Sequence, residues 1–181
     1  MNTLMEVVKY VCDQNDIHVK QLSDRIGFKF MLSGKNSMFV GGIEIDEKYG
    51  AVSVTTHVPL MVPKNIMAKI VELVVRINEA TCVGNFKLHI ETGTICYKTS
   101  IIFGKAPAHH EIIEHLLFAN WILADRWFPL IAEVLFGNTS PQKAFEAFLD
   151  YEDPSCESEE TSPSVHPFRR NLGDLAGGAL N

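Results

Sequence analysis

The chain has 181 residues, is 46% hydrophobic and 21% charged, and carries a formal net charge of −6. This length fits one domain with a proper core, and the composition is that of an ordinary globular protein. The charge is unevenly distributed: residues 150–181 hold seven acids and two bases, a net of −5, so the remaining residues carry only −1. A near-neutral domain with an acidic end lacks the basic surface that binds phosphates. We therefore expect neither nucleic acid nor an anionic membrane as a partner.

The start of the chain does not look like a secretory signal. It has no basic n-region, and Glu6 and Lys9 interrupt its apolar residues. No stretch reaches the roughly 18 apolar residues that a membrane helix needs. The cysteines at 12, 82, 96 and 156 are scattered without a CxxC pair, which favours free thiols in a reducing compartment. These observations predict a cytoplasmic protein.

The first part of the chain predicts a helix followed by a three-stranded meander. Asn2 or Thr3 can cap a helix that runs to about Asp13. Three extended segments then alternate with short turns rich in glycine, asparagine and aspartate. The predicted strands are 28–32, 38–45 and 52–58.

Pro63 opens a helix over 64–80 that is apolar around most of its circumference. A single sheet face cannot cover so wide an arc, so this helix should pack against the sheet and a second element. Asn78 interrupts the apolar arc. If it is buried, its amide must be hydrogen-bonded, most simply to backbone at the turn formed by 82–85. We predict a structural role for Asn78 rather than ligand binding.

The second half predicts a hairpin and a long helix. Strands over 86–91 and 94–103 flank Thr92-Gly93, and their alternation indicates a sheet with one buried and one wet face. A helix over 108–136 should kink or split at Pro129, with its first half ending at Phe128. A short helix over 141–149 follows.

The element order α-βββ-α-ββ-α predicts an α+β fold, an antiparallel five-stranded sheet with helices packed on one face. Residues 1–149 should form a single domain. Residues 150–181 are rich in Glu, Ser, Thr and Pro and cannot bury enough surface to offset their ordering entropy. We predict that they are a disordered acidic tail.

Several runs resemble the centre of the YbjN family: Val75-Arg76-Ile77-Asn78-Glu79, Gly84-Asn85-Phe86-Lys87-Leu88, and the segment 93–100. The segments 43–46 and 57–63 resemble the family's entry to its central helix, and the resemblance spans roughly residues 20–147. This family is described as candidate regulators of bacterial sensory transduction, with a fold similar to type III secretion chaperones. The resemblance implies a compact domain that acts by binding and can be dimeric. It transfers no catalytic residues, because none are established for the family.

Two groups of residues invite a metal or enzyme interpretation. The string His109–His115 looks like a zinc-peptidase motif, but His110 and His115 are five apart, about 140° around a helix, so they cannot hold one ion from a single turn. A second group lies on the wet face of the hairpin, where we predict that His89 faces Cys96, with His57 as a further candidate. No fourth ligand is indicated. We therefore predict no metal and no cofactor.

The last long helix carries apolar residues on more than one side. Phe118, Trp121 and Ile122 point away from the expected core stripe, which is Ile112, Leu116, Ala119, Leu123, Trp127, Leu130 and Val134. Either a neighbouring loop or the final short helix covers them, or they form a patch for a second chain. In the second case Phe118, Trp121 and Ile122 are a partner interface, and a symmetric homodimer is the simplest form.

These patterns predict a non-enzymatic regulatory or chaperone-like module that binds a protein partner, whose identity the residues do not indicate. Two alternatives stay open. One is a metal-binding protein or enzyme that uses His89, Cys96 and the His109–His115 segment. The other is a structural subunit of a larger assembly.

Overall fold

The computed structural model describes residues 3–152. Its helices are α1 (Leu4–Gln14), α2 (Met67–Ala80), α3 (His110–Phe136) and α4 (Pro141–Glu152), and a 3-10 turn, η1 (Lys64–Ile66), precedes α2. Its strands are β1 (Val19–Gln21), β2 (Gly27–Ser33), β3 (Met38–Asp46), β4 (Ala51–Met61), β5 (Asn85–His89) and β6 (Thr94–Ile102). Because α4 continues to Glu152, the first three residues of the predicted tail are helical; the rest of that tail lies outside the described residues.

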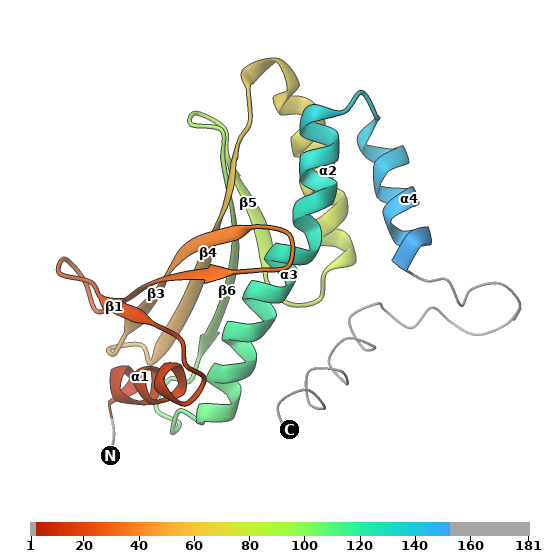
Figure 1. The fold of residues 1–181 in the computed structure, drawn as a ribbon. Coiled ribbons are helices and arrows are strands. Elements are labelled where there is room, and N and C mark those ends of the chain that lie inside the picture. The colour runs from red at the N-terminus through yellow and green to blue at the C-terminus, as the bar shows by residue number, and fades with distance from the viewer. Residues whose placement is uncertain (1–2, 153–181) are drawn as a thin grey trace, which may run out of the picture.

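The strands form one antiparallel sheet in the order β1-β2-β3-β4-β6-β5, and helices pack on it (Figure 1). The predicted α+β class and antiparallel sheet are confirmed, but the predicted strand number was wrong, because the sheet has six strands rather than five. The missed strand, β1, is only three residues long and pairs Val19 with Phe30 at one edge. A strand this short shows no alternation that a sequence pattern can reveal.

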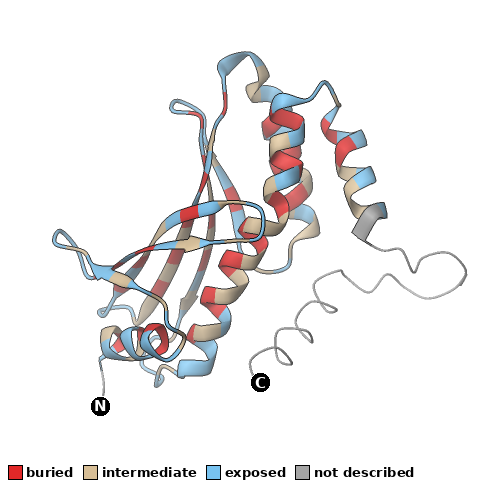
Figure 2. Ribbon diagram, viewed as in Figure 1, coloured by how far each residue is buried: buried red, intermediate tan, exposed pale blue. Residues whose placement is uncertain are grey.

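Burial alternates along the strands because successive side chains point to opposite faces of the sheet (Figure 2). In β3, Phe39 and Ile43 are fully buried, whereas Val40 is exposed. In β4, Val52 and Val54 are fully buried under the helices. Within residues 3–152, the helices therefore cover one face of the sheet and leave the other uncovered.

Helix α3 runs across the covered face and links the two halves of the core (Figure 1). Its first half packs with α1 and the β2–β3 side of the sheet, and its second half packs with α2 and α4. Trp127 belongs to the second half, where Phe145 of α4 stacks on it with ring centroids 6.0 Å apart. None of the helices within residues 3–152 is long and apolar enough to cross a membrane.

Of the kink or split predicted at Pro129, the split is wrong, because α3 is one continuous helix from His110 to Phe136. Proline has no N–H to donate to the carbonyl four residues earlier, which belongs to Asp125. That carbonyl oxygen instead accepts a hydrogen bond from Asn36 Nδ2 at 3.0 Å. A side chain from the β2–β3 turn thus replaces the donor that Pro129 removes.

A buried amide fixes α3 at the centre of the sheet. Asn120 is fully buried, and its Oδ1 accepts a 2.6 Å hydrogen bond from Thr56 Oγ1. Its Nδ2 donates to the carbonyl oxygens of Val54 and Tyr97 at 3.2 and 3.3 Å, and to Thr99 Oγ1 at 3.3 Å. One amide therefore joins α3 to two neighbouring strands, β4 and β6. No motif or periodicity in the sequence indicates this residue.

We predict that Asn120→Ala lowers the free energy of unfolding by about 2 to 4 kcal/mol, because it leaves buried carbonyl and hydroxyl groups without partners and creates a small cavity. Urea denaturation followed by circular dichroism measures this. Asn85→Ala, at an exposed asparagine of β5, is the matched control and should change stability by less than about 0.5 kcal/mol. Similar losses in the two variants would contradict the role given to Asn120.

Candidate binding face of the sheet

The uncovered face of the sheet, called here the open face, is defined by cross-strand pairs. Strand register places Met31, Val40, His57, Cys96 and Lys87 in one row across β2, β3, β4, β6 and β5. Residues directly opposite one another in a sheet point to the same side. All of this row therefore belongs to the open face.

The β2–β3 end of the open face is apolar. Met31 and Val40 are directly opposed and are 64% and 54% exposed, and Met38, two residues before Val40 in β3, is 58% exposed. Three large apolar side chains thus stand together in water on one hairpin. Single exposed apolar residues are ordinary, but a contiguous group is typical of a surface that another molecule covers.

The remainder of the central open face is basic. The next row of cross-strand pairs on this face, adjacent to the row of His57, contains Lys20, Lys29 and Lys98. In the row of His57 itself, Lys87 lies opposite Cys96. The acids of the strands on this face, Glu44 and Asp46, are at its far end. There Glu44 pairs with Arg25, and Asp46 accepts a hydrogen bond from the backbone N–H of Tyr49. The centre of the open face is consequently positive in a chain whose net charge is negative.

The predicted pairing of His89 with Cys96 is wrong. The loop between β5 and β6 spans residues 90–93, so His89 pairs with Thr94, and Cys96 is opposite His57 and Lys87. Gly93 sets this longer loop: its φ is +72°, and a Cβ there would lie 2.4 Å from the carbonyl oxygen of Val62. The predicted loop had two residues and the observed loop has four. The register therefore shifts, and His89 faces Thr94 instead of Cys96.

Cys96 is half-buried among the strands of the open face. Burial raises the pKa of its thiol, and the neighbouring charges of Lys87 and Lys98 only partly oppose this. The protonated thiol therefore predominates at neutral pH, and Cys96 is not an activated nucleophile. Within residues 3–152 there is no group of three or more His, Cys, Asp or Glu side chains that could hold a metal ion.

The histidine-rich string begins α3. His109 is the N-cap residue and makes no side-chain capping bond, and the ring of His110 lies edge-on to Tyr10 with centroids 6.0 Å apart. Glu111 lies in the first turn of the helix, where a carboxylate is favoured by the helix dipole.

The predicted orientation of the Phe118, Trp121 and Ile122 group needs a correction. Trp121 is only 8% exposed and packs edge-on against Phe30 of β2, with ring centroids 5.3 Å apart. Phe118 and Ile122 are half-buried. The helical wheel placed Trp121 outside because it assumed one covering surface for α3, whereas α1 and β2 cover a second side. A partner interface at Phe118 and Ile122 stays a prediction.

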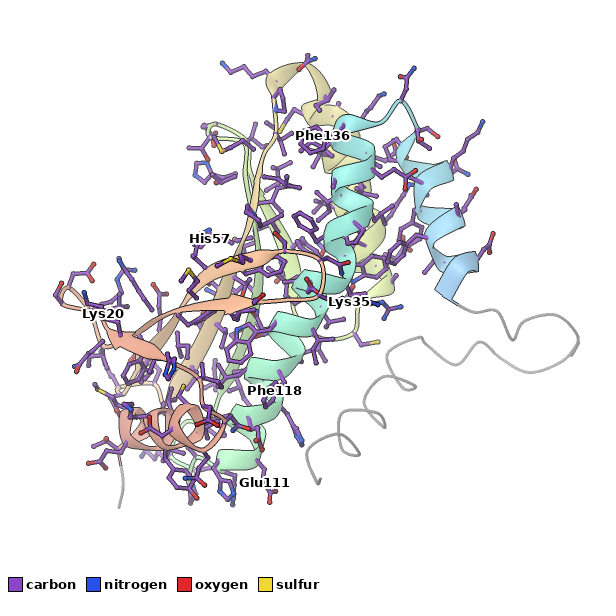
Figure 3. All side chains as sticks on the ribbon, in the orientation of Figure 1. Lys20, Lys35, His57, Glu111, Phe118 and Phe136 are labelled. Atoms are coloured by element: carbon purple, nitrogen blue, oxygen red, sulfur yellow. The ribbon has the colours of Figure 1, made fainter. Side chains whose placement is uncertain are left out.

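The β2–β3 turn is attached to α3 by the carboxylate of Asp125, which accepts hydrogen bonds from the backbone N–H groups of Lys35 and Asn36 at 3.0 and 2.9 Å. Figure 3 shows Lys35 at the tip of this hairpin, beside α3. Gly34 permits the approach, because a Cβ there would lie 2.3 Å from Asp125 Oδ1. Asp125 thereby fixes the hairpin that carries Met31, Met38 and Val40.

We predict that Asp125→Ala lowers the free energy of unfolding by about 1 to 2 kcal/mol, because two backbone donors lose a charged acceptor. Amide hydrogen exchange at Lys35 and Asn36 should accelerate about tenfold or more, since the turn opens locally. Glu133→Ala, at an exposed acid of the same helix, is the control and should leave both measurements unchanged. Unaltered exchange at Lys35 in the Asp125 variant would show that the carboxylate does not hold the turn.

Asn78 occupies the outer edge of β5. Its Oδ1 accepts a hydrogen bond from the backbone N–H of Phe86 at 2.7 Å, and its Nδ2 donates to the Phe86 carbonyl at 3.1 Å. Phe86 follows directly after the turn that the sequence analysis named. These two bonds take the place of pairing with an adjacent strand, because they satisfy the backbone N–H and carbonyl groups of Phe86, which point away from β6. The edge of the sheet is thus partly closed by a side chain of α2.

We predict that Asn78→Leu costs about 1 to 3 kcal/mol of stability and produces self-association that grows with protein concentration, because it leaves an open strand edge. Chemical denaturation and static light scattering measure the two effects. Glu79→Leu adds the same apolar side chain at the next position, where the residue is exposed, and should not cause association through the edge. Equal association in both variants would attribute the effect to surface hydrophobicity alone.

Comparison with known proteins places this fold. No protein-family model and no curated protein sequence matches the chain. Among solved structures, YbjN from E. coli, described as a candidate transcription regulator, superposes with a TM-score of 0.50 at 7% identity, covering 72% of this chain and 87% of that one. The fold is YbjN-like. The ExsC–ExsE complex also matches, with a TM-score of 0.47 at 11% identity, over 71% of this chain and 92% of that one.

Proposed function

We propose that the protein is a non-enzymatic module of chaperone-like or regulatory type that binds a polypeptide partner on the open face of its sheet. The observation that carries this proposal is the exposed apolar group Met31, Met38 and Val40 on a sheet whose other face is covered by helices. The YbjN-like fold supports a regulatory role, as the description of E. coli YbjN does for that protein. We infer that the protein acts in the cytoplasm.

The composition of the open face suits a polypeptide. Methionine side chains are long, unbranched and polarizable, so they adapt to partners of different shape. Here Met31 and Met38 flank Val40. Lys87 lies in the same row of cross-strand pairs as Val40, and Lys20, Lys29 and Lys98 lie in the adjacent row. Apolar contacts supply affinity and the surrounding charges select the partner.

Binding on the face is favoured over addition of a strand at an edge. Asn78 already occupies the backbone groups of Phe86 on the β5 side. At the opposite edge, β1 is three residues long and offers few groups for pairing. The face is therefore the larger surface for a partner among the described residues.

The face proposal is tested with Met31→Glu/Val40→Glu in the full chain. Two new carboxylates in the contact should weaken partner binding by about tenfold or more, since each buried charge would be unpaired. The readout is recovery of the partner with tagged protein from nuclease-treated lysate, quantified by mass spectrometry. Val75→Glu, at a 60% exposed valine on α2, is the matched control and should keep the partner.

Two outcomes would overturn this proposal. If the double variant and the control recover the same protein in the same amount, the open face is not the binding surface. If light scattering shows that wild type is a dimer and the double variant a folded monomer, a second copy covers the face.

A further inference from the structure

The charge of the open face is opposite to that of one segment of the same chain. Lys87 and Lys98 lie on neighbouring strands beside Cys96, and both influence its thiol electrostatically. Lys20 and Lys29 extend the positive surface across β2 and β1. Residues 153–181 contain five acids and two bases, and Glu157, Glu159 and Glu160 are clustered near the start of this segment.

Chain length allows Glu159 and Glu160 to reach the lysines. α4 ends at Glu152, and α2 contacts both α4 and β5. A path around α2 and the β5 edge is roughly 20 Å long, taking a helix diameter of about 10 Å and a layer spacing of about 10 Å. Glu159 and Glu160 are seven and eight residues beyond Glu152, which allows at most about 24 and 27 Å of extended chain, whereas Glu157, five residues beyond, is limited to about 17 Å.

The order of residue types also matches. Moving from the β5 edge inward, the open face presents Lys87 and Lys98 first and then the apolar group, with Val40 about three strand spacings or 14 Å from Lys87 and with Lys29 in the row next to Met31. Moving along the chain from α4, the acids come first, and Val165 and Phe168 follow. Val165 is six residues beyond Glu159, a separation that spans about 20 Å when extended and is enough to cover that distance.

We propose that residues 159–168 dock in cis on the open face, with Glu159 and Glu160 on Lys87 and Lys98 and the apolar residues toward Met31 and Val40. The segment then covers the surface assigned to the partner and competes with it. This autoinhibitory consequence rests on the proposed function, whereas the docking itself does not. Attraction between exposed charges weakens with salt, so the docking should be salt-sensitive.

Two native cysteines report on the docking. Cys96 is half-buried on the open face between His57 and Lys87, and Cys82 is exposed in the α2–β5 connection. In the full chain, Glu157→Gln/Glu159→Gln/Glu160→Gln should release the segment. We expect iodoacetamide to alkylate Cys96 about threefold or more faster in this variant than in wild type at about 20 mM salt. The difference should vanish at about 0.5 M salt, and Cys82 should react at the same rate in both.

Asp174→Asn, which removes a charge elsewhere in the same segment, should keep Cys96 protected. Equal Cys96 rates in wild type and the triple variant at low salt would overturn the proposal. Protection that increases with protein concentration would overturn docking in cis and assign the segment to a second copy. Mass spectrometry of the alkylated peptides gives each rate separately.

The same variants separate the two proposals. If the segment docks and the open face binds the partner, the triple glutamine variant recovers more partner than wild type. If Cys96 is not protected but Met31→Glu/Val40→Glu still loses the partner, docking fails and the proposed function stands. If Cys96 is protected and the double variant keeps its partner, docking stands and the partner binds elsewhere.

Discussion

The amide of Asn120 is the interaction on which the arrangement of the molecule depends. It lies fully buried and bonds backbone carbonyls of β4 and β6 from the middle of α3. A buried amide tolerates few positions, because any shift leaves polar groups without partners. It therefore defines the place of α3 on the sheet, whereas the apolar residues around it would accept several packings. The other helices then pack against α3 or beside it.

Two further polar side chains on helices repeat this principle at the periphery. Asp125 holds the backbone of the β2–β3 turn, and Asn78 holds the backbone of Phe86 at the β5 edge. In each case the side chain makes the hydrogen bonds that these backbone groups would otherwise make with water or with another chain. Together they make one hairpin rigid and one edge less available, and neither contributes a side chain to the open face.

The open face follows from this one-sided arrangement. Since the helices gather on one face, the alternating residues of each strand have to be exposed on the other. On β4 and β6 the large apolar residues exposed on this face, Met61 and Ile102, stand singly near strand ends, whereas Met31, Met38 and Val40 gather on the β2–β3 hairpin. The hairpin that Asp125 fixes is thus the one that exposes apolar surface, which gives a binding surface of defined shape.

The sequence by itself determined the element types and much of their order, because helical and strand periodicities are local properties of the chain. It also identified Asn78 as a residue needing a partner, since a lone amide within an apolar arc must be hydrogen-bonded wherever that arc is buried. Only the tertiary structure decided which surfaces meet. The three-residue β1, the register that separates His89 from Cys96, the burial of Trp121 and the Asn120 bonds all depend on contacts between segments far apart in the chain. Such contacts leave no periodic signature, and a helical wheel cannot show that α3 is covered on more than one side.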